Sequence, residues 1–397
     1  MTGSYDPSLA LIYWGTGNPC PDFIGDERKG DNLYTASVIA LDVKTGKLKW
    51  HYQFTPHDIH DWDSSQPMVL VDETWEGQPR KLLLHTDKNG MLYVLDRTNG
   101  KFLRGTPFTS LLTWNSGFDK NGRPILTQID IVCPSSGVNW TDVAYSPQTK
   151  LFYGRVTDSC GVNPQGESGL DPLAGNNRWF GAVGARTPST PEMAQRLAEI
   201  RAKYPPGPFV RAVNLATGRK VWDYELSMGR TTGVLATAGN LVFIGGMGGI
   251  VALNAMTGEK LWHVDAGQTK CDGVCNAASA MTYMVGGKQY LAMSGYGTLI
   301  GYGLEQEGRT VTSLGASPVS STTKPGAGEA LPTAPGKDVT LRVCSNCHAA
   351  DVWSGLRLRQ SAWEETLERM RVRGMALAPD EYKTVLDYLS KYWSGVN

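Results

Sequence analysis

Two cysteines and a histidine near the C-terminus carry the strongest chemical signal in the sequence. Cys344 and Cys347 are separated by two residues, and His348 follows directly. This spacing attaches a c-type haem, with the two thiols bonded to the haem and the histidine bound to the iron. A zinc site would need further Cys or His ligands, and none follows His348. A thioredoxin-like dithiol would need a βαβ context, which the sequence does not show.

The second axial ligand of such a haem is commonly a methionine. Met370 and Met375 both lie at a suitable separation from the haem motif. Met370 also continues a helical stripe with Trp363 and Leu367, so its position fits a packing role as well. The residues by themselves leave the choice between the two methionines open.

Composition narrows the class of protein. The chain has 397 residues, and its 38 Lys and Arg residues equal its 38 Asp and Glu residues. This balance gives no electrostatic case for nucleic acid or an anionic membrane surface, and no run of apolar residues is long enough for a transmembrane segment. Haem attachment and the other cysteines indicate an oxidising compartment, so we expect the export signal to lie outside this sequence.

An internal repeat organises most of the chain. Each copy predicts a strand, a turn of the form Asp/Asn-x-x-Thr-Gly, and a second strand ending in a tryptophan that packs against its neighbour. The clear copies are Ala40 to Trp50, Ala212 to Trp222 and Ala252 to Trp262, and degenerate ones are Val94 to Lys101 and Ala144 to Tyr153. Short strands with Gly-rich turns and many aromatic residues favour a β-propeller over a sandwich.

The chain is predicted to contain two domains. Residues 1–305 form the propeller part, with a helix expected after Ser189 and Thr190, where Pro191 occupies a first turn. Residues 306–337 are rich in Gly, Ser, Thr, Pro and Ala, which is the composition of a flexible linker. Residues 338–397 show helical periodicity and the size of a small all-α cytochrome c domain.

The repeats, the linker and the haem motif together resemble the quinohaemoprotein alcohol dehydrogenases. In that family an eight-bladed propeller binds pyrroloquinoline quinone (PQQ), and a C-terminal cytochrome c receives the electrons. The resemblance is sharpest at three motifs that occur in family order, Gly15 to Pro19, Trp50 to Asp61 and His85 to Gly90. It implies an incomplete propeller here, because the matching region starts inside the family's propeller, after a portion that bears a glutamate metal ligand, a stacking tryptophan and a cysteine pair.

The resemblance assigns roles to four residues. Asn18 matches an amide ligand of the active-site metal, and Asp61 matches the catalytic aspartate that also approaches the metal. Lys88 matches a Lys or Arg beside the quinone oxygens. Asp63 has the offset of an extra aspartate in lanthanide-dependent members, so Ca²⁺ and a lanthanide both remain open.

Further assignments follow from the same resemblance. Asn139 and Trp140 match family sequence near PQQ, and Met370, rather than Met375, matches the axial methionine of the cytochrome. Cys133 and Cys160 match positions that are joined by a disulfide in relatives. Cys271 and Cys275 are expected to form a second disulfide, which leaves Cys20 as the odd cysteine, while Arg230 to Gly233 departs from the tryptophan-containing family motif that lines the quinone pocket.

The resemblance therefore implies a periplasmic alcohol dehydrogenase that uses PQQ, Ca²⁺ or a lanthanide, and haem c. Its electrons would pass to an external cytochrome, cupredoxin or quinone. The alternative is a non-catalytic propeller scaffold fused to an electron-transfer cytochrome. The sequence leaves the alcohol open, because specificity depends on loop shapes.

Overall fold

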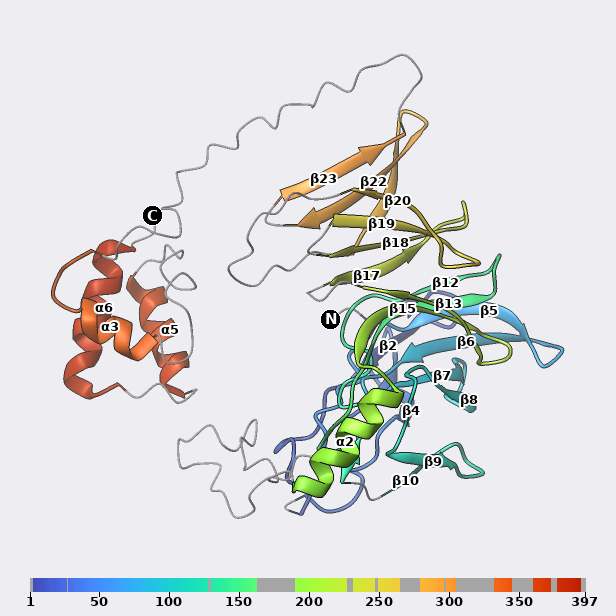
Figure 1. Cartoon of the computed structure of the whole chain (residues 1–397), viewed down its shortest axis with the longest axis horizontal. Coiled ribbons are helices and arrows are strands. Elements are labelled where there is room, and N and C mark those ends of the chain that lie inside the picture. The colour runs from blue at the N-terminus through green and yellow to red at the C-terminus, as the bar shows by residue number, and fades with distance from the viewer. Residues whose placement is uncertain are drawn as a thin grey trace. The chain divides into compact units, whose positions relative to one another are not determined.

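The computed structural model describes residues 3–26, 28–127, 130–162, 190–226, 231–246, 249–264, 279–295, 298–304, 332–344, 360–372 and 377–393. The chain divides into two compact units. One contains all the strands and helix α2, and the other contains helices α3, α5 and α6 (Figure 1).

The larger unit contains four sheets of four strands and one of three, which follow one another along the described chain. The first sheet consists of β1 (Ser4–Asp6), β2 (Leu11–Gly15), β3 (Ser37–Asp42) and β4 (Leu48–Gln53). The second consists of β5 (Val69–Trp75), β6 (Gln78–Thr86), β7 (Met91–Asp96) and β8 (Phe102–Pro107). The third is β12 (Ala144–Ser146), β13 (Leu151–Asp158), β15 (Gly207–Asn214), β16 (Lys220–Glu225). The fourth consists of β17 (Thr231–Ala236), β18 (Leu241–Gly246), β19 (Gly249–Asn254) and β20 (Lys260–Val264). The fifth consists of β21 (Met281–Val285), β22 (Lys288–Gly295) and β23 (Thr298–Gly303).

Two short ribbons lie between the second and third sheets in the sequence. They are β9 (Asn115–Phe118) with β10 (Pro124–Leu126), and β11 (Ile131–Val132) with β14 (Gly161–Val162).

Buried side chains join each sheet to the next. Tyr13 from the first sheet packs with Leu83 and Tyr93 from the second, and all three are fully buried. Separate clusters connect the second sheet with the third and the third with the fourth. Face-to-face packing of successive antiparallel sheets is the arrangement of propeller blades, so the fold predicted from the repeats is present in this unit.

The repeat turns form as the sequence predicts. Gly46, Gly218 and Gly258 have φ between +67° and +74°, which favours glycine. In each turn an Asp or Asn side chain accepts hydrogen bonds from the backbone N–H groups that follow. The copy expected from Ala144 to Tyr153 differs, because it forms the first two strands of its sheet rather than the last two.

The repeat tryptophans connect neighbouring blades. Trp50 lies against Gly100 in the next blade, where a Cβ would come within 2.5 Å of the indole ring. Trp222 lies against Gly258 in the same manner, and its indole N–H donates to the carbonyl oxygen of Ala255 at 3.0 Å. These tryptophans therefore have the packing role that the sequence predicts.

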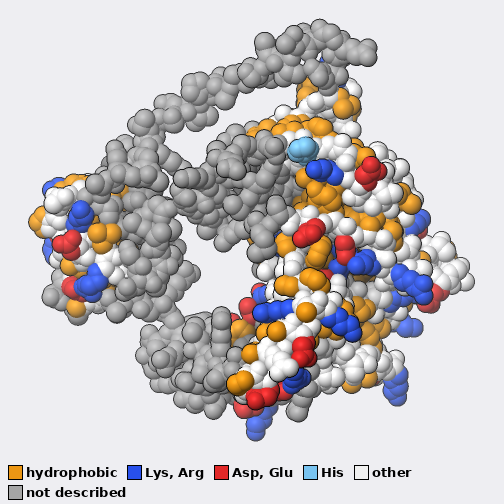
Figure 2. All heavy atoms as spheres, in the orientation of Figure 1, with side chains coloured by type: hydrophobic (Ala, Val, Ile, Leu, Met, Phe, Trp, Pro, Cys, Tyr) orange, Lys and Arg blue, Asp and Glu red, His pale blue; other side chains and the backbone are white. Residues whose placement is uncertain are grey.

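Helix α2 (Pro191–Lys203) begins where the proline and capping residues predict it. Thr190 is the N-cap, and its hydroxyl accepts the N–H of Met193 at 3.2 Å. Leu197 and Ile200 pack against a cluster that contains Cys133 and Cys160. Figure 2 shows that charged side chains of both signs are interspersed on the visible face of this unit, as the zero net charge suggests.

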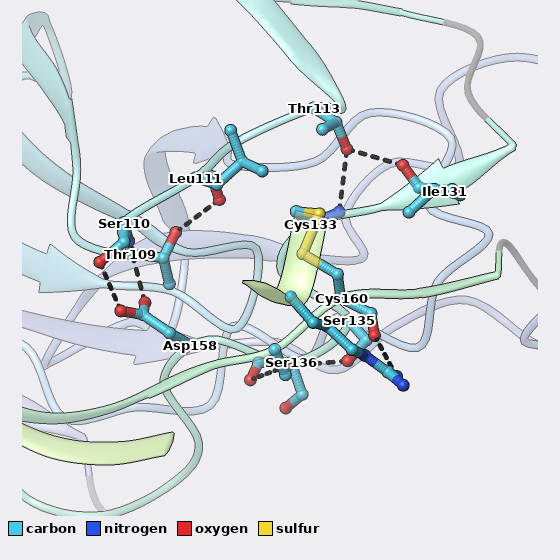
Figure 3. The surroundings of a disulfide bond; sticks show 12 residues. Thr109, Ser110, Leu111, Thr113, Ile131, Cys133, Ser135, Ser136, Asp158 and Cys160 are labelled. Atoms are coloured by element: carbon cyan, nitrogen blue, oxygen red, sulfur yellow. Dashed lines mark hydrogen bonds between the residues drawn. A yellow bond between two sulfur atoms is a disulfide. The ribbon is translucent and has the colours of Figure 1, made fainter. Parts of the chain in front are cut away.

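Cys133 and Cys160 form a disulfide, in agreement with the pairing inferred from the resemblance. Figure 3 shows the Thr113 hydroxyl beside it, where this group accepts the Cys133 N–H and donates to the carbonyl oxygen of Ile131, both at 2.9 Å. Cys271 and Cys275 lie outside the described residues.

The smaller unit has its own core. It is built by α3 (Lys337–Cys344), α5 (Gln360–Val372) and α6 (Pro379–Tyr392). Trp363 and Leu367 are buried against Leu389 and Trp393, and the Trp363 indole donates to the carbonyl oxygen of Trp393 at 3.1 Å. None of the helices in the described part of the chain is long and apolar enough to cross a membrane.

Candidate functional site

Three loops of the larger unit bring four of the predicted site residues together. Asn18 follows β2, Asp61 and Asp63 lie between β4 and β5, and Lys88 lies in the turn between β6 and β7. The Lys88 ammonium is 3.1 Å from Oδ2 of Asp61 and 3.4 Å from Oδ2 of Asp63. The backbone N–H of Asn18 donates to Oδ1 of Asp63 at 3.2 Å. These residues form one polar cluster, which we call the Asp61–Lys88 site.

Burial and charge act on the site in opposite directions. Burial raises the pKa of Asp61, and the nearby Asp63 carboxylate adds to the rise, while Lys88 opposes it. Burial of Lys88 would lower its pKa, but Asp61 and Asp63 together outweigh burial and raise it. The geometry thus favours a charged ammonium next to a carboxylate whose basicity is increased.

Asp58 supports the loop that presents Asp61, a role that the sequence analysis missed. Asp61 has φ of +60°, which is unusual for a residue with a side chain. Asp58 is 1% exposed, and its carboxylate accepts the N–H groups of His60 at 3.0 Å and Trp62 at 2.8 Å. Because these two residues flank Asp61, both hydrogen bonds hold Asp61 in this conformation.

The environment of Asp58 strongly affects its ionisation. Burial raises the pKa of Asp58 to about 7, and the carboxylates of Asp61 and Asp87 add to the rise. The hydrogen bonds from Trp62 and His60 oppose it, since they stabilise the charged form.

The turn that carries Lys88 is held by its neighbours. Oδ1 of Asp87 accepts the N–H of Asn89 at 3.0 Å, and the Asn89 amide donates to the hydroxyl of Tyr93 at 2.9 Å. Gly90 completes the turn with φ of +88°. The motif from His85 to Gly90 therefore builds a rigid turn and leaves Lys88 to point toward the carboxylates.

The segment that leads to Asn139 and Trp140 contacts the lysine turn through the backbone of Gly137. The N–H of Gly137 donates to the carbonyl oxygen of Lys88 at 2.8 Å, and a Cβ on Gly137 would come within 2.8 Å of Cα of Gly90. Asn139 is half-buried and accepts the N–H of Trp140 at 2.9 Å, while Trp140 is exposed. In the described residues, Gly137 provides the contact with the lysine turn rather than either predicted side chain.

Asp22 is a further carboxyl group near the site that the sequence analysis missed. Burial raises its pKa, a hydrogen bond with the Asn18 side chain opposes the rise, and Asp61 and Asp63 add to it. Its only signal in the sequence is its position four residues after Asn18.

The oxygen atoms of the Asp61–Lys88 site suit a hard cation, but there are few of them. Asn18, Asp61 and Asp63 offer amide and carboxylate oxygens, which Ca²⁺ and similar ions prefer, although such ions take about six to eight oxygen ligands. No group of three or more His, Cys, Asp or Glu residues able to hold a metal occurs within the described ranges. The residues present therefore fit part of a coordination shell.

The haem motif is only partly described. Cys344 is the last residue of α3. Cys347, His348 and Met375 lie outside the described residues, and Met370 lies in α5 without a described side chain. The haem ligands consequently stay predictions.

Fold and site together define a quinoprotein-type β-propeller. A family model described as the β-propeller domain of glucose, ethanol and alcohol dehydrogenases that use PQQ matches residues 1–107, and one described as outer membrane protein assembly factor BamB matches residues 208–326. A quinohemoprotein alcohol dehydrogenase of Comamonas testosteroni is 38% identical over 314 residues, which cover 75% of this chain and 42% of the relative.

Solved structures agree with this relationship. The crystal structure of quinohemoprotein alcohol dehydrogenase from Comamonas testosteroni matches with a TM-score of 0.61 and 27% identity, over 98% of this chain and 62% of that one. A europium-containing methanol dehydrogenase matches with a TM-score of 0.56 and 28% identity, over 73% of this chain and 50% of that one. The chain is thus similar in sequence and fold to quinohaemoprotein alcohol dehydrogenases, and it spans less than half the length of the Comamonas relative in the sequence match.

Proposed function

We propose that this protein oxidises an alcohol to an aldehyde or ketone with PQQ and a hard cation, and that its electrons pass to a covalently bound haem c. The observation that carries the proposal is the Asp61–Lys88 site, where a partly buried carboxylate lies 3.1 Å from an ammonium group in a propeller of the matching family. Relatives that are named as alcohol dehydrogenases support the reaction class.

The residues have complementary tasks in this proposal. Asp61 accepts the hydroxyl proton of the alcohol, since burial raises its basicity. When bound, PQQ supplies the acceptor for the hydride from the carbinol carbon. Lys88 stabilises negative charge that develops near its ammonium. Asn139 and Trp140 are proposed to contact the quinone, from the segment that Gly137 ties to Lys88.

Asn18, Asp61 and Asp63 are proposed to hold the cation, either Ca²⁺ or a lanthanide. Asp63 adds a second negative charge to the donor set, which favours a trivalent ion more strongly than a divalent one. A europium-containing enzyme among the structural relatives supports keeping the lanthanide open.

The helical unit is proposed to be the cytochrome c domain. Cys344 and Cys347 would carry the haem, with His348 and Met370 as axial ligands. An external cytochrome, cupredoxin or quinone would take the electrons. Because haem attachment and disulfides both require an oxidising environment, we propose a periplasmic location.

The test uses the haem-loaded protein reconstituted with PQQ and either Ca²⁺ or La³⁺. Alcohols should reduce the haem, which is seen as a change in its visible absorption bands, and Asp61→Asn should abolish this change. Asp42→Asn is the matched control, because Asn214 and Asn254 fill the equivalent place in other repeats. Haem that responds only to a chemical reductant would overturn the proposal in favour of a non-catalytic scaffold fused to an electron-transfer cytochrome.

The haem assignment has its own test. Cys344→Ala with Cys347→Ala should remove covalently bound haem, measured by the pyridine haemochrome spectrum of the denatured protein. Covalent haem that persists in this double variant would contradict the assignment.

A further inference from the structure

We infer that the buried hydrogen bond between Ser64 and Asp87 positions the Lys88 ammonium against Asp61 and Asp63. This inference rests on the proposed function, because it takes the Asp61–Lys88 site as the reaction centre. It assigns positioning roles to two residues whose side chains do not contact that ion pair.

The geometry consists of two parallel contacts between the same two loops. Ser64 follows Asp63 directly, and Asp87 precedes Lys88 directly. The Ser64 hydroxyl donates to Oδ2 of Asp87 at 2.6 Å, while the next residues outward, Asp63 and Lys88, approach to 3.4 Å. The inner contact therefore sets the distance between the backbones that carry the outer one.

The two contacts differ in their environment. Ser64 and Asp87 are both 0% exposed, whereas the side chain of Asp63 is 34% exposed. A hydrogen bond to a carboxylate is short and strong when water is excluded, whereas an ion pair with a partly exposed carboxylate is weaker and costs the entropy of a long lysine side chain. The inner bond is thus the stronger of the two and can hold the weaker pair in place.

Both ends of the inner bond are firmly attached. The backbone N–H of Ser64 donates to the carbonyl oxygen of Thr16 at 3.0 Å, and a Cβ on Gly15 would come within 1.9 Å of the Ser64 carbonyl oxygen. Asp87 also lies 3.2 Å from Nε2 of His85 through the same Oδ2 atom. The bond consequently connects the loop of Asn18, the loop of Asp61 and the turn of Lys88.

A serine, an aspartate and a histidine in contact invite comparison with a hydrolase triad. Here, however, Ser64 and His85 both contact Oδ2 of Asp87, and within the described ranges no histidine nitrogen is hydrogen-bonded to the serine hydroxyl. All three side chains are 0% exposed, which prevents a substrate from reaching the hydroxyl. The arrangement therefore supports structure around the site rather than a second reaction.

A double-mutant cycle tests the inference without any cofactor. Lys88→Met should shift the urea midpoint of the wild-type protein, and this shift should shrink by about half or more in the Ser64→Ala background, because the lysine is already misplaced there. Ser146→Ala is the matched control, since Ser146 is another buried serine with a local hydrogen bond in a different blade. In that background the full effect of Lys88→Met should remain. Equal shifts in the Ser64→Ala and wild-type backgrounds would overturn the inference.

A kinetic measurement separates positioning from general destabilisation. In the reconstituted holoprotein, Ser64→Ala should lower kcat about tenfold with KM nearly unchanged, whereas Ser146→Ala should leave both at wild-type values. A wild-type kcat in Ser64→Ala would contradict the inference. If the wild-type protein itself oxidises no alcohol, the proposed function fails, and the unfolding cycle still decides whether Ser64 and Asp87 position Lys88.

Discussion

The ammonium of Lys88 bridges Asp61, at 3.1 Å, and Asp63, at 3.4 Å. The two aspartates come from the loop between β4 and β5, and the lysine from the turn between β6 and β7. One cation thus offsets two carboxylates that would otherwise repel each other in a partly buried place. This relationship links proton transfer, cation binding and charge stabilisation in the proposed reaction.

Replacing Lys88 by methionine should reduce alcohol oxidation by about a hundredfold or more. The variant keeps a side chain of similar length but loses the charge that we propose stabilises the reduced cofactor. The measurement is alcohol-dependent haem reduction in the reconstituted protein. Lys49→Met is the control, because Lys49 pairs with Asp42 at the surface; an unchanged rate in Lys88→Met would contradict the proposed role.

Asp63→Asn should weaken lanthanide binding more than Ca²⁺ binding. The substitution keeps an oxygen donor but removes one negative charge, and a trivalent ion loses more Coulomb energy than a divalent one. Terbium luminescence titration, followed by competition with Ca²⁺, measures both affinities. Equal losses for the two ions would argue against Asp63 as the residue that favours the trivalent ion.

Asp58→Asn should change how stability depends on pH. In the native protein the Asp58 pKa is raised from 3.8 to about 7, so the native state holds its proton more tightly than the unfolded chain. The associated stability is present below about pH 4 and is lost as pH rises through about 7, by up to about 4 kcal/mol. Asparagine at this position cannot ionise, so the variant should not lose stability in this way as the pH rises.

The measurement is the free energy of urea unfolding at several pH values between 4 and 8. In the control variant Asp42→Asn, the free energy of unfolding should still fall with rising pH as in the wild type, because Asp58 is unchanged. A parallel dependence in wild type and Asp58→Asn would show that Asp58 titrates normally in the folded protein.

Removing the disulfide with Cys133→Ala and Cys160→Ala should destabilise the larger unit. Closing a loop with a sequence separation of 27 residues restricts the unfolded chain, which the loop-entropy relation converts to about 3.5 kcal/mol. Urea unfolding with and without dithiothreitol checks this: the reductant should destabilise the wild type by more than it destabilises the variant, in which only the expected Cys271–Cys275 bond is left to reduce. An equal effect of the reductant on both proteins would contradict the stabilising role of the Cys133–Cys160 bond.

Repetition in the sequence determined the blade architecture. The turn at Gly46 and the contact of Trp50 with Gly100 depend on local backbone geometry and on a spacing that recurs, so the sequence alone predicts them. The cap at Thr190 is local in the same sense. Asp61 and Lys88 were found because each lies in a motif that resembles a family, not because their separation in the sequence predicts contact.

Only the tertiary structure identified the supports of the site. Asp58 and Ser64 are ordinary loop residues in the sequence, and their importance depends on burial and on partners that the fold supplies. The sequence by itself determined which residue types are available, how the blades repeat and where the haem motif lies. Folding decided which of the polar residues are removed from water and brought within hydrogen-bonding distance, because those properties depend on segments that meet only when the blades pack together.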